Sequence, residues 1–363
     1  MNVFIDTNAF FNNWFVGNVN FKLLFHYLNN ENLDLLLSEL VVQEVNNLRN
    51  REVVASKSEI KKHFKRLHKL NSGSIGVAIE DISTSEYDIK TILEGKVHSI
   101  ENIDYEGISQ KEVVQRALNV TKPFTDGEKG YRDTLIWLSF LKYLKDNSIT
   151  GDVAFITDNK SDFFEKKGSD LVLNGDLQKD IIALEIRANI KPYLKVFDFN
   201  KENVDQIANA VNKYEILDDE EYFLIEETES YLNSMSNSVL SNLLGSRVFG
   251  EKLTEVIDIK SDIFEGLEDP EVNYVSELSD SSVYISCSYE MRTVDLVVTI
   301  DLVEFKQHVD DIENIKALYN IEIDEGTVNL SFTFRLYIDA SFEYDTTSEI
   351  CSNLSIEQLS GRS

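Results

Sequence analysis

The chain has 363 residues, of which 42% are hydrophobic and two are cysteine, which excludes a disulfide-framed mini-protein and a low-complexity chain. The net charge of −29, from 64 acidic and 35 basic residues, argues against a protein whose whole surface coats nucleic acid. The first residues lack the pattern of a signal peptide and no run of about 18 apolar residues occurs, so we expect a cytoplasmic protein with no membrane span.

The charge is divided unevenly along the chain. Residues 201–363 hold 35 acidic and 10 basic residues, whereas residues 1–200 hold 29 acidic and 25 basic ones. A length of this size predicts two or three domains, at about 100–200 residues per domain. We therefore expect a first domain over 1–200 and an acidic second domain over 201–363, with different tasks.

The first domain alternates apolar strand-like runs with helical patterns, which is typical of an α/β fold with a central parallel sheet. Buried strands are expected at residues 3–6, 33–37 and 153–157, with further strands at 171–173 and 194–197. Helices are expected at residues 21–29, 39–51, 57–70, 130–144 and 176–190. The stretch of about 55–128 is interpreted as a helical insertion.

The second domain changes character along its length. Its pattern is helical and acidic to about residue 265, and from about 272 to 345 apolar and polar residues alternate over long runs. This period of two predicts an antiparallel sheet with one wet face. A helix at 306–318 is expected to connect two strands, so the domain is predicted to be α+β.

Two aspartates stand at the ends of predicted buried strands. Asp6 ends the run VFID and Asp158 follows the run VAFIT. Because ligand sites form at the carboxyl ends of strands in an open parallel sheet, these two carboxylates should point to one edge. Each of them, taken alone, is equally compatible with a helix N-cap.

Two further carboxylates interrupt apolar helix faces. Glu44 lies four residues after Leu40 on a face that packs on the core, and Asp133 precedes Trp137 by four residues. Either one alone could reach solvent or pair with a basic residue. An unpaired buried carboxylate costs several kcal/mol, so four such placements together indicate a cation. Oxygen-only ligands favour Mg²⁺ or Mn²⁺, the ions used in phosphodiester hydrolysis.

The segments FIDTNAF, SELVVQEV, GYRDTLIWLSFLKY and FITDNKSDF, in this order, resemble the PIN-domain nucleases. The closest resemblance is to large bacterial PIN-like proteins with a long insertion and a C-terminal extension, and it covers about residues 1–200. It implies an α/β/α sandwich in which Asp6, Glu44, Asp133 and Asp158 are catalytic and bind Mg²⁺ or Mn²⁺. It adds Asp162 as a further metal ligand, and Thr7 and Asn8 as residues that orient the site.

A basic stretch follows the helix of Glu44. Lys57, Lys61, Lys65 and Lys69 recur every four residues on one helix face, with Lys62 and Arg66 beside them, and Ile60, Phe64 and Leu67 form the opposite, core-facing stripe. A charge run is usually a solvated face, but next to a nuclease site we expect it to contact the backbone of nucleic acid. Lys129 and Arg132, beside Asp133, could contact the scissile phosphate or pair with nearby acidic residues.

The sequence thus predicts a metal-dependent endonuclease, with RNA as the expected substrate and a role in defence or toxicity as an analogy with the family. The acidic domain is expected to bind a protein partner or build a homo-oligomer. Two alternatives stay open: a non-catalytic binding or regulatory protein on a PIN-like scaffold, and a structure-specific DNA nuclease.

Overall fold

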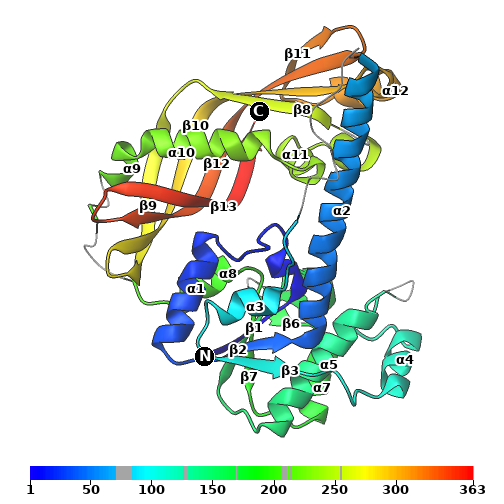
Figure 1. Cartoon of the computed structure of the whole chain (residues 1–363), viewed down its shortest axis with the longest axis vertical. Helices are drawn as coiled ribbons and strands as arrows, with labels where there is room; N and C mark the ends of the chain where they lie inside the picture. Colours follow the sequence, from blue (N-terminus) through cyan, green and yellow to red (C-terminus); the bar gives the residue numbers. More distant parts are fainter. Residues whose placement is uncertain are drawn as a thin grey trace. The chain divides into compact units, whose positions relative to one another are not determined.

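The computed structural model describes residues 1–70, 84–125, 129–168, 170–206, 211–212, 215–253 and 256–362. The chain divides into two compact units (Figure 1). Unit 1 contains Met1–Gly17 and Leu24–Val204, and unit 2 contains Asn18–Leu23 and Asp205–Ser363. None of the described helices has an apolar stretch long enough to cross a membrane.

Unit 1 is built on a five-stranded parallel sheet with the order β3-β2-β1-β4-β7. Its central strand, β1 (Asn2–Ile5), has Val3, Phe4 and Ile5 fully buried, so both of its faces are covered. The other strands are β2 (Leu35–Ser38), β3 (Ile100–Ile103), β4 (Asp152–Ile156) and β7 (Asn189–Tyr193). The α/β architecture with a parallel sheet predicted from the sequence is confirmed.

The helices of unit 1 follow the strands in the expected order. The long ones are α1 (Val19–Asn30), α2 (Glu39–Leu70) and α5 (Tyr131–Asp146), and the shorter ones are α3 (Ile89–Glu94), α4 (Gln110–Leu118), α6 (Lys160–Phe163), α7 (Gly175–Ala183) and α8 (Val196–Asn203). A short 3₁₀ turn, η1 (Thr7–Phe10), follows β1 directly. The carboxyl end of β1 is therefore followed directly by η1, and that of β4 is followed by α6.

An aromatic cluster holds the elements of this edge together. The rings of Phe4 on β1 and Phe155 on β4 stack with centroids 5.0 Å apart, and Phe140 on α5 lies 4.8 Å from Phe4. Trp137, also on α5 and fully buried, contacts Phe155 edge-on at 5.6 Å. Such pairs add about 0.5–1.5 kcal/mol each beyond their buried area, so they stabilise the packing of β1, β4 and α5 against one another.

The stretch interpreted as a helical insertion is not wholly helical. Ile100–Ile103 forms β3, an edge strand of the central sheet that pairs in parallel with β2. Its two middle residues, Glu101 and Asn102, are exposed, so the strand shows no buried apolar run in the sequence. The helices expected at 39–51 and 57–70 are one continuous helix, α2, because no glycine or proline interrupts them. Residues 71–83 and 126–128 of the expected insertion lie outside the described residues.

One of the two strand predictions near the end of unit 1 was wrong. The last strand of the sheet is β7, not residues 194–197, and Val196–Asn203 is helical. Pro192 sits inside β7, which is tolerated because β7 is an edge strand, and the proline weakens the strand pattern of the sequence. Asp170–Leu173 does form a strand, β6, but it pairs with β5 (Phe164–Lys167) in a separate hairpin.

Unit 2 combines helices with a six-stranded antiparallel sheet, as expected from the period-two pattern. Its helices are α9 (Ile216–Asp219), α10 (Glu221–Asn233), α11 (Asn237–Leu243), the π-helix η3 (Val248–Lys252) and α12 (Leu302–Glu313). Its strands are β8 (Val256–Ile263), β9 (Leu267–Ser279), β10 (Ser282–Asp301), β11 (Leu318–Ile323), β12 (Thr327–Asp345) and β13 (Ile350–Arg362). The helical part ends before the predicted residue 265, because IDIKSDI already alternates as β8.

Two long strands organise this sheet. β10 and β12 pair along their whole length, and β10 changes its outer partner from β9 to β8 at a register shift between Met291 and Val294. β12 likewise pairs first with β11 and then with β13. The buried hydroxyl groups of Thr228 on α10 and Tyr289 on β10 lie 3.0 Å apart, which links a helix to the middle of the sheet.

Residues Asn18–Leu23 belong to unit 2 although they come from the beginning of the chain. Asn20 on α1 is 3% exposed, accepts a 2.8 Å hydrogen bond from the Tyr284 hydroxyl, and donates to Glu357 at 2.5 Å. The amide nitrogen of Asn20 also lies 3.3 Å from the hydroxyl oxygens of Ser341 and Ser355. One amide thus contacts polar groups on three strands.

We expect Asn20→Ala to lower the free energy of unfolding of unit 2 by about 2 kcal/mol, because buried partners lose hydrogen bonds without gaining water. Asn30→Ala is the matched control, since Asn30 is exposed near the end of the same helix and bonds only locally to His26. Urea unfolding followed by circular dichroism measures both variants.

A fragment of residues 205–363 gives a second measurement. Its melting temperature should rise when a peptide of residues 13–30 is added and should not respond to the same peptide carrying Asn20→Ala. A melting temperature that neither peptide changes would show that residues 18–23 are not part of this fold.

Candidate functional site

The side chain of Asp6 occupies the end of the central strand. It is 1% exposed, and its two oxygens accept hydrogen bonds from the Thr7 backbone N–H at 2.8 Å and from the Thr157 hydroxyl at 2.7 Å. Thr157 follows β4, and the Asp6 backbone N–H bonds to the Ile156 carbonyl there at 2.9 Å. Asp6 is also the N-cap of η1, so the capping role considered from the sequence is fulfilled as well.

Two acidic residues act electrostatically on Asp6. The pKa of Asp6 is raised to about 7, mainly by burial and in part by the negative charges of Asp133 and Glu44, while the hydrogen bonds from Thr157 and Thr7 oppose the shift. Burial also raises the pKa of Asp133 to about 6, with the charges of Glu44 and Asp162 adding to the effect and Arg132 opposing it. The charge of Glu44 therefore acts on both Asp6 and Asp133, and the charge of Asp162 acts on Asp133.

Glu44 is held from two sides. The Thr7 hydroxyl donates to its Oε2 at 2.8 Å, and Arg132 Nη1 lies 2.5 Å from its Oε1. Its side chain is 12% exposed, in line with its position on the core-facing side of α2. Thr7 bonds to Asp6 through its backbone and to Glu44 through its side chain, so it fixes both carboxylates relative to each other.

Asp162 and Asp158 have different surroundings. Asp162 lies in α6 with a side chain that is 16% exposed, and Lys122 Nζ lies 3.4 Å from its Oδ1. Asp158 is exposed, and its charge adds to the effect of burial, which raises the pKa of Asp198 on α8. Asn8, in η1, is also exposed.

The donor set fits a hard divalent cation. All four carboxylates supply oxygen, and the raised pKa values of Asp6 and Asp133 mean that burial and neighbouring negative charges disfavour their ionised forms, which a bound cation would favour. Within the described ranges, no three acidic, histidine or cysteine side chains already converge as a ready-made metal centre. The outer carboxylates are instead paired with cations, Glu44 with Arg132 and Asp162 with Lys122.

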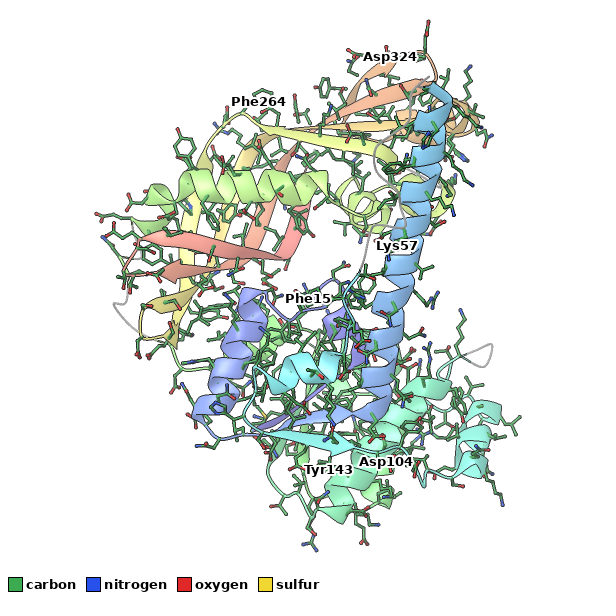
Figure 2. All side chains as sticks on the ribbon, viewed as in Figure 1. Phe15, Lys57, Asp104, Tyr143, Phe264 and Asp324 are labelled. Carbon is green, nitrogen blue, oxygen red and sulfur yellow. The ribbon has the colours of Figure 1, made fainter. Side chains whose placement is uncertain are left out.

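The predicted basic stripe lies on the C-terminal half of α2 (Figure 2, where Lys57 is labelled). Lys61, Lys65, Arg66 and Lys69 are exposed, Lys62 pairs with Glu59 at 2.6 Å, and Lys57 donates to Thr84 at 3.4 Å. The opposite stripe is not a core face throughout, because Leu67 is 51% exposed while Ile60 and Phe64 are half-buried. Lys129 is exposed, whereas Arg132 pairs with Glu44 rather than with a neighbour in sequence.

Two residues at the site were not predicted from the sequence. Thr157 could have been found, because it ends an apolar run directly before Asp158 just as Thr7 follows Asp6. Lys122 has no such signal, since its partner Asp162 lies 40 residues further along the chain.

A family model described as PIN domain matches residues 3–163. No curated protein and no solved structure matches the chain. The matched region contains β1, α2, α5, β4 and α6, and with them Asp6, Glu44, Asp133 and Asp162. Residues 3–163 are therefore identified as a PIN domain, the domain of the PIN-domain nucleases.

Proposed function

We propose that the chain is a divalent-metal-dependent endoribonuclease. The observation that carries the proposal is the electrostatic state of Asp6 and Asp133, whose charged forms are disfavoured by burial and by neighbouring carboxylates. A site that concentrates negative charge in this way becomes favourable when a cation occupies it. The PIN-domain match supports a nuclease, and the oxygen-only donor set supports Mg²⁺ or Mn²⁺.

Asp6, Glu44, Asp133 and Asp162 would hold the ion, with Asp158 as an exposed additional ligand at the rim. When bound, the ion supplies an activated water and stabilises the leaving oxygen of the phosphodiester. Thr7 and Thr157 orient the Asp6 carboxylate through hydrogen bonds of 2.8 and 2.7 Å. Arg132 holds Glu44 in place through its 2.5 Å ion pair.

RNA is proposed as the substrate, with the basic stripe of α2 as the surface that follows its backbone. Unit 2 would not grip the phosphates, since residues 201–363 carry 35 acidic and 10 basic residues. We assign to unit 2 the binding of a protein partner or of a second copy. Incubation of the purified protein with single-stranded RNA and with branched DNA, each with Mn²⁺ or with chelator, tests the function: cleavage of RNA in Mn²⁺ alone is expected.

Asp6→Asn should abolish cleavage and change how stability depends on pH. The folded-state pKa of Asp6, about 7, lies above its ordinary value of 3.8, so the native state binds the proton more tightly than the unfolded state. The metal-free parent should therefore lose stability as pH rises from about 4 to 7 and stay at the lower level above that.

The Asn variant keeps the shape without the charge, and the rotatable Thr157 hydroxyl can accept from its amide. In chelator at pH 8 it should be as stable as the parent or more stable, by about 1 kcal/mol, with a flatter pH profile. The control is Asp146→Asn on α5, where the carboxylate is exposed and paired with Lys142. If Asp6→Asn unfolds well below the parent at pH 8, Asp6 is a structural cap.

A metal titration of the melting temperature tests the ligand set. The parent should gain roughly 2.7 kcal/mol when Mg²⁺ or Mn²⁺ is at about 100 times its dissociation constant. This gain should shrink strongly in Asp6→Asn and Asp133→Asn. Comparing Asp162→Asn with Asp158→Asn identifies the outer ligand: we expect the larger loss for Asp162, whose charge acts on Asp133. An unresponsive parent would contradict the metal site.

Changing Lys61, Lys65 and Lys69 together to Glu should weaken RNA binding and flatten its salt dependence, because phosphate contacts release counterions. The melting temperature should change little, since all three side chains are exposed. Fluorescence anisotropy across a salt series measures the slope, with Lys142→Glu on α5 as a single-charge control. Unchanged affinity and slope would make the stripe an ordinary solvated surface.

A further inference from the structure

The loop between α4 and α5 places one lysine at the carboxylate site. Lys122 Nζ donates to the Ser161 carbonyl at 2.8 Å and lies 3.4 Å from Asp162 Oδ1. Ser161 and Asp162 both belong to α6, whereas Lys122 comes from the other side of α5 in the sequence. An ammonium has three protons, and these two acceptors leave one direction for an oxygen of a ligand.

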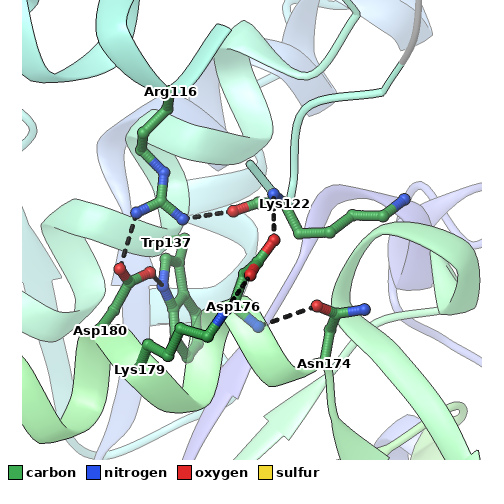
Figure 3. A network of polar contacts seen from close by, with 7 residues as sticks. All are labelled: Arg116, Lys122, Trp137, Asn174, Asp176, Lys179 and Asp180. Carbon is green, nitrogen blue, oxygen red and sulfur yellow. Dashed lines mark hydrogen bonds and ion pairs between the residues drawn. The ribbon is translucent and has the colours of Figure 1, made fainter. Parts of the chain in front are cut away.

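The backbone of Lys122 is clamped from both sides (Figure 3). Its N–H donates to Asp176 Oδ2 at 3.3 Å, and its carbonyl accepts a hydrogen bond from Arg116 Nη2. Arg116 is 8% exposed and pairs with Asp180 at 2.8 Å, and Asp180 also accepts from the indole N–H of buried Trp137 at 2.9 Å. The main chain of this loop residue is thus tied to α4, α5 and α7.

The same loop is pressed against the start of α5. Gly130 has φ +111°, and a Cβ at this position would lie 2.6 Å from the Pro123 carbonyl oxygen, so only glycine allows the approach. Thr125 and Lys129 add a backbone hydrogen bond of 3.0 Å across the loop. The first turn of α5 carries Arg132 and Asp133, so the position of Lys122 relative to the site is set by packing.

Two cations therefore bracket the carboxylates, Arg132 on Glu44 and Lys122 on Asp162. In the absence of substrate, each neutralises an outer carboxylate. During hydrolysis the phosphate gains negative charge, and a cation whose main chain is held in place can stabilise that charge.

We propose that Lys122 is a substrate-contacting residue whose ammonium binds a non-bridging oxygen of the scissile phosphate, and that Arg116 is the positioning residue that fixes it there. The inference rests on the proposed nuclease function. Lys122 is a cation that does not belong to the basic stripe of α2. Release of Asp162 to a metal ion leaves the ammonium available to the phosphate.

The test compares Lys122→Met, which keeps the length and removes the charge, with Lys122→Arg, which keeps the charge. The control is Lys142→Met, an exposed lysine on α5 paired with Asp146. We expect kcat/KM for single-stranded RNA to fall about 100-fold in Lys122→Met, as for the loss of one transition-state donor. Lys122→Arg should restore at least a tenth of the parental value, and Lys142→Met should equal the parent.

Two further measurements separate substrate contact from a structural role. RNA binding is measured in the Asp6→Asn background across a salt series. Adding Lys122→Met should reduce the slope of log affinity against log salt concentration by about one, as for the loss of a single phosphate contact. The melting shift caused by Mn²⁺ should be retained or increased in Lys122→Met, because a competing cation leaves Asp162.

Parental kcat/KM or an unchanged salt slope in Lys122→Met would overturn the assignment of Lys122. Loss of the Mn²⁺ shift in that variant would also overturn it, by showing that Lys122 only supports Asp162. A parent that neither cuts RNA nor responds to Mn²⁺ would instead overturn the proposed nuclease function.

Discussion

A carboxylate buried at the end of the central strand is the constraint on which the site of this protein depends. Asp6 stands at the edge where β1 and β4 end together, and the aromatic rings of Phe4, Phe155 and Phe140 keep those strands and α5 in place. Because its oxygens are fixed by two threonine donors, the charge cannot turn toward water. The neighbouring acidic residues then act on a group that has no freedom to avoid them.

The inner and outer carboxylates of the site are treated differently by the protein. Glu44 and Asp162 each have a cation within ion-pair distance, whereas the pKa values of Asp6 and Asp133 are raised. This arrangement limits the electrostatic cost of folding without an ion, because only part of the negative charge is left without a nearby cation. A bound cation would therefore interact most favourably with the two inner carboxylates, Asp6 and Asp133.

Much of this could be predicted from the sequence where a local pattern carried the information. The apolar runs before Asp6 and Asp158 marked β1 and β4, and Glu44 and Asp133 stood out because they interrupt apolar helix faces. The edge strands β3 and β7 were not predicted from the sequence, because β3 is polar and β7 contains Pro192. Pairing in the sheet, rather than local composition, defines both strands. The distinction between Asp158 and Asp162 depends on side-chain direction after β4. Lys122 depends on Arg116 and Asp180, a contact over 64 residues.

The position of Asn20 in unit 2 has a consequence for how the chain is made. Its partners Ser341, Ser355 and Glu357 follow it by 321, 335 and 337 residues, so they are synthesised long after it. Contacts of such sequence separation form slowly, because a long loop must close first. Residues 18–23 must therefore wait, unpaired with their sheet, while the residues of the PIN domain on either side of them are already available to fold. Unit 2 is then completed only after β12 and β13 have been made, and it takes up a segment that lies within the region matched by the PIN domain.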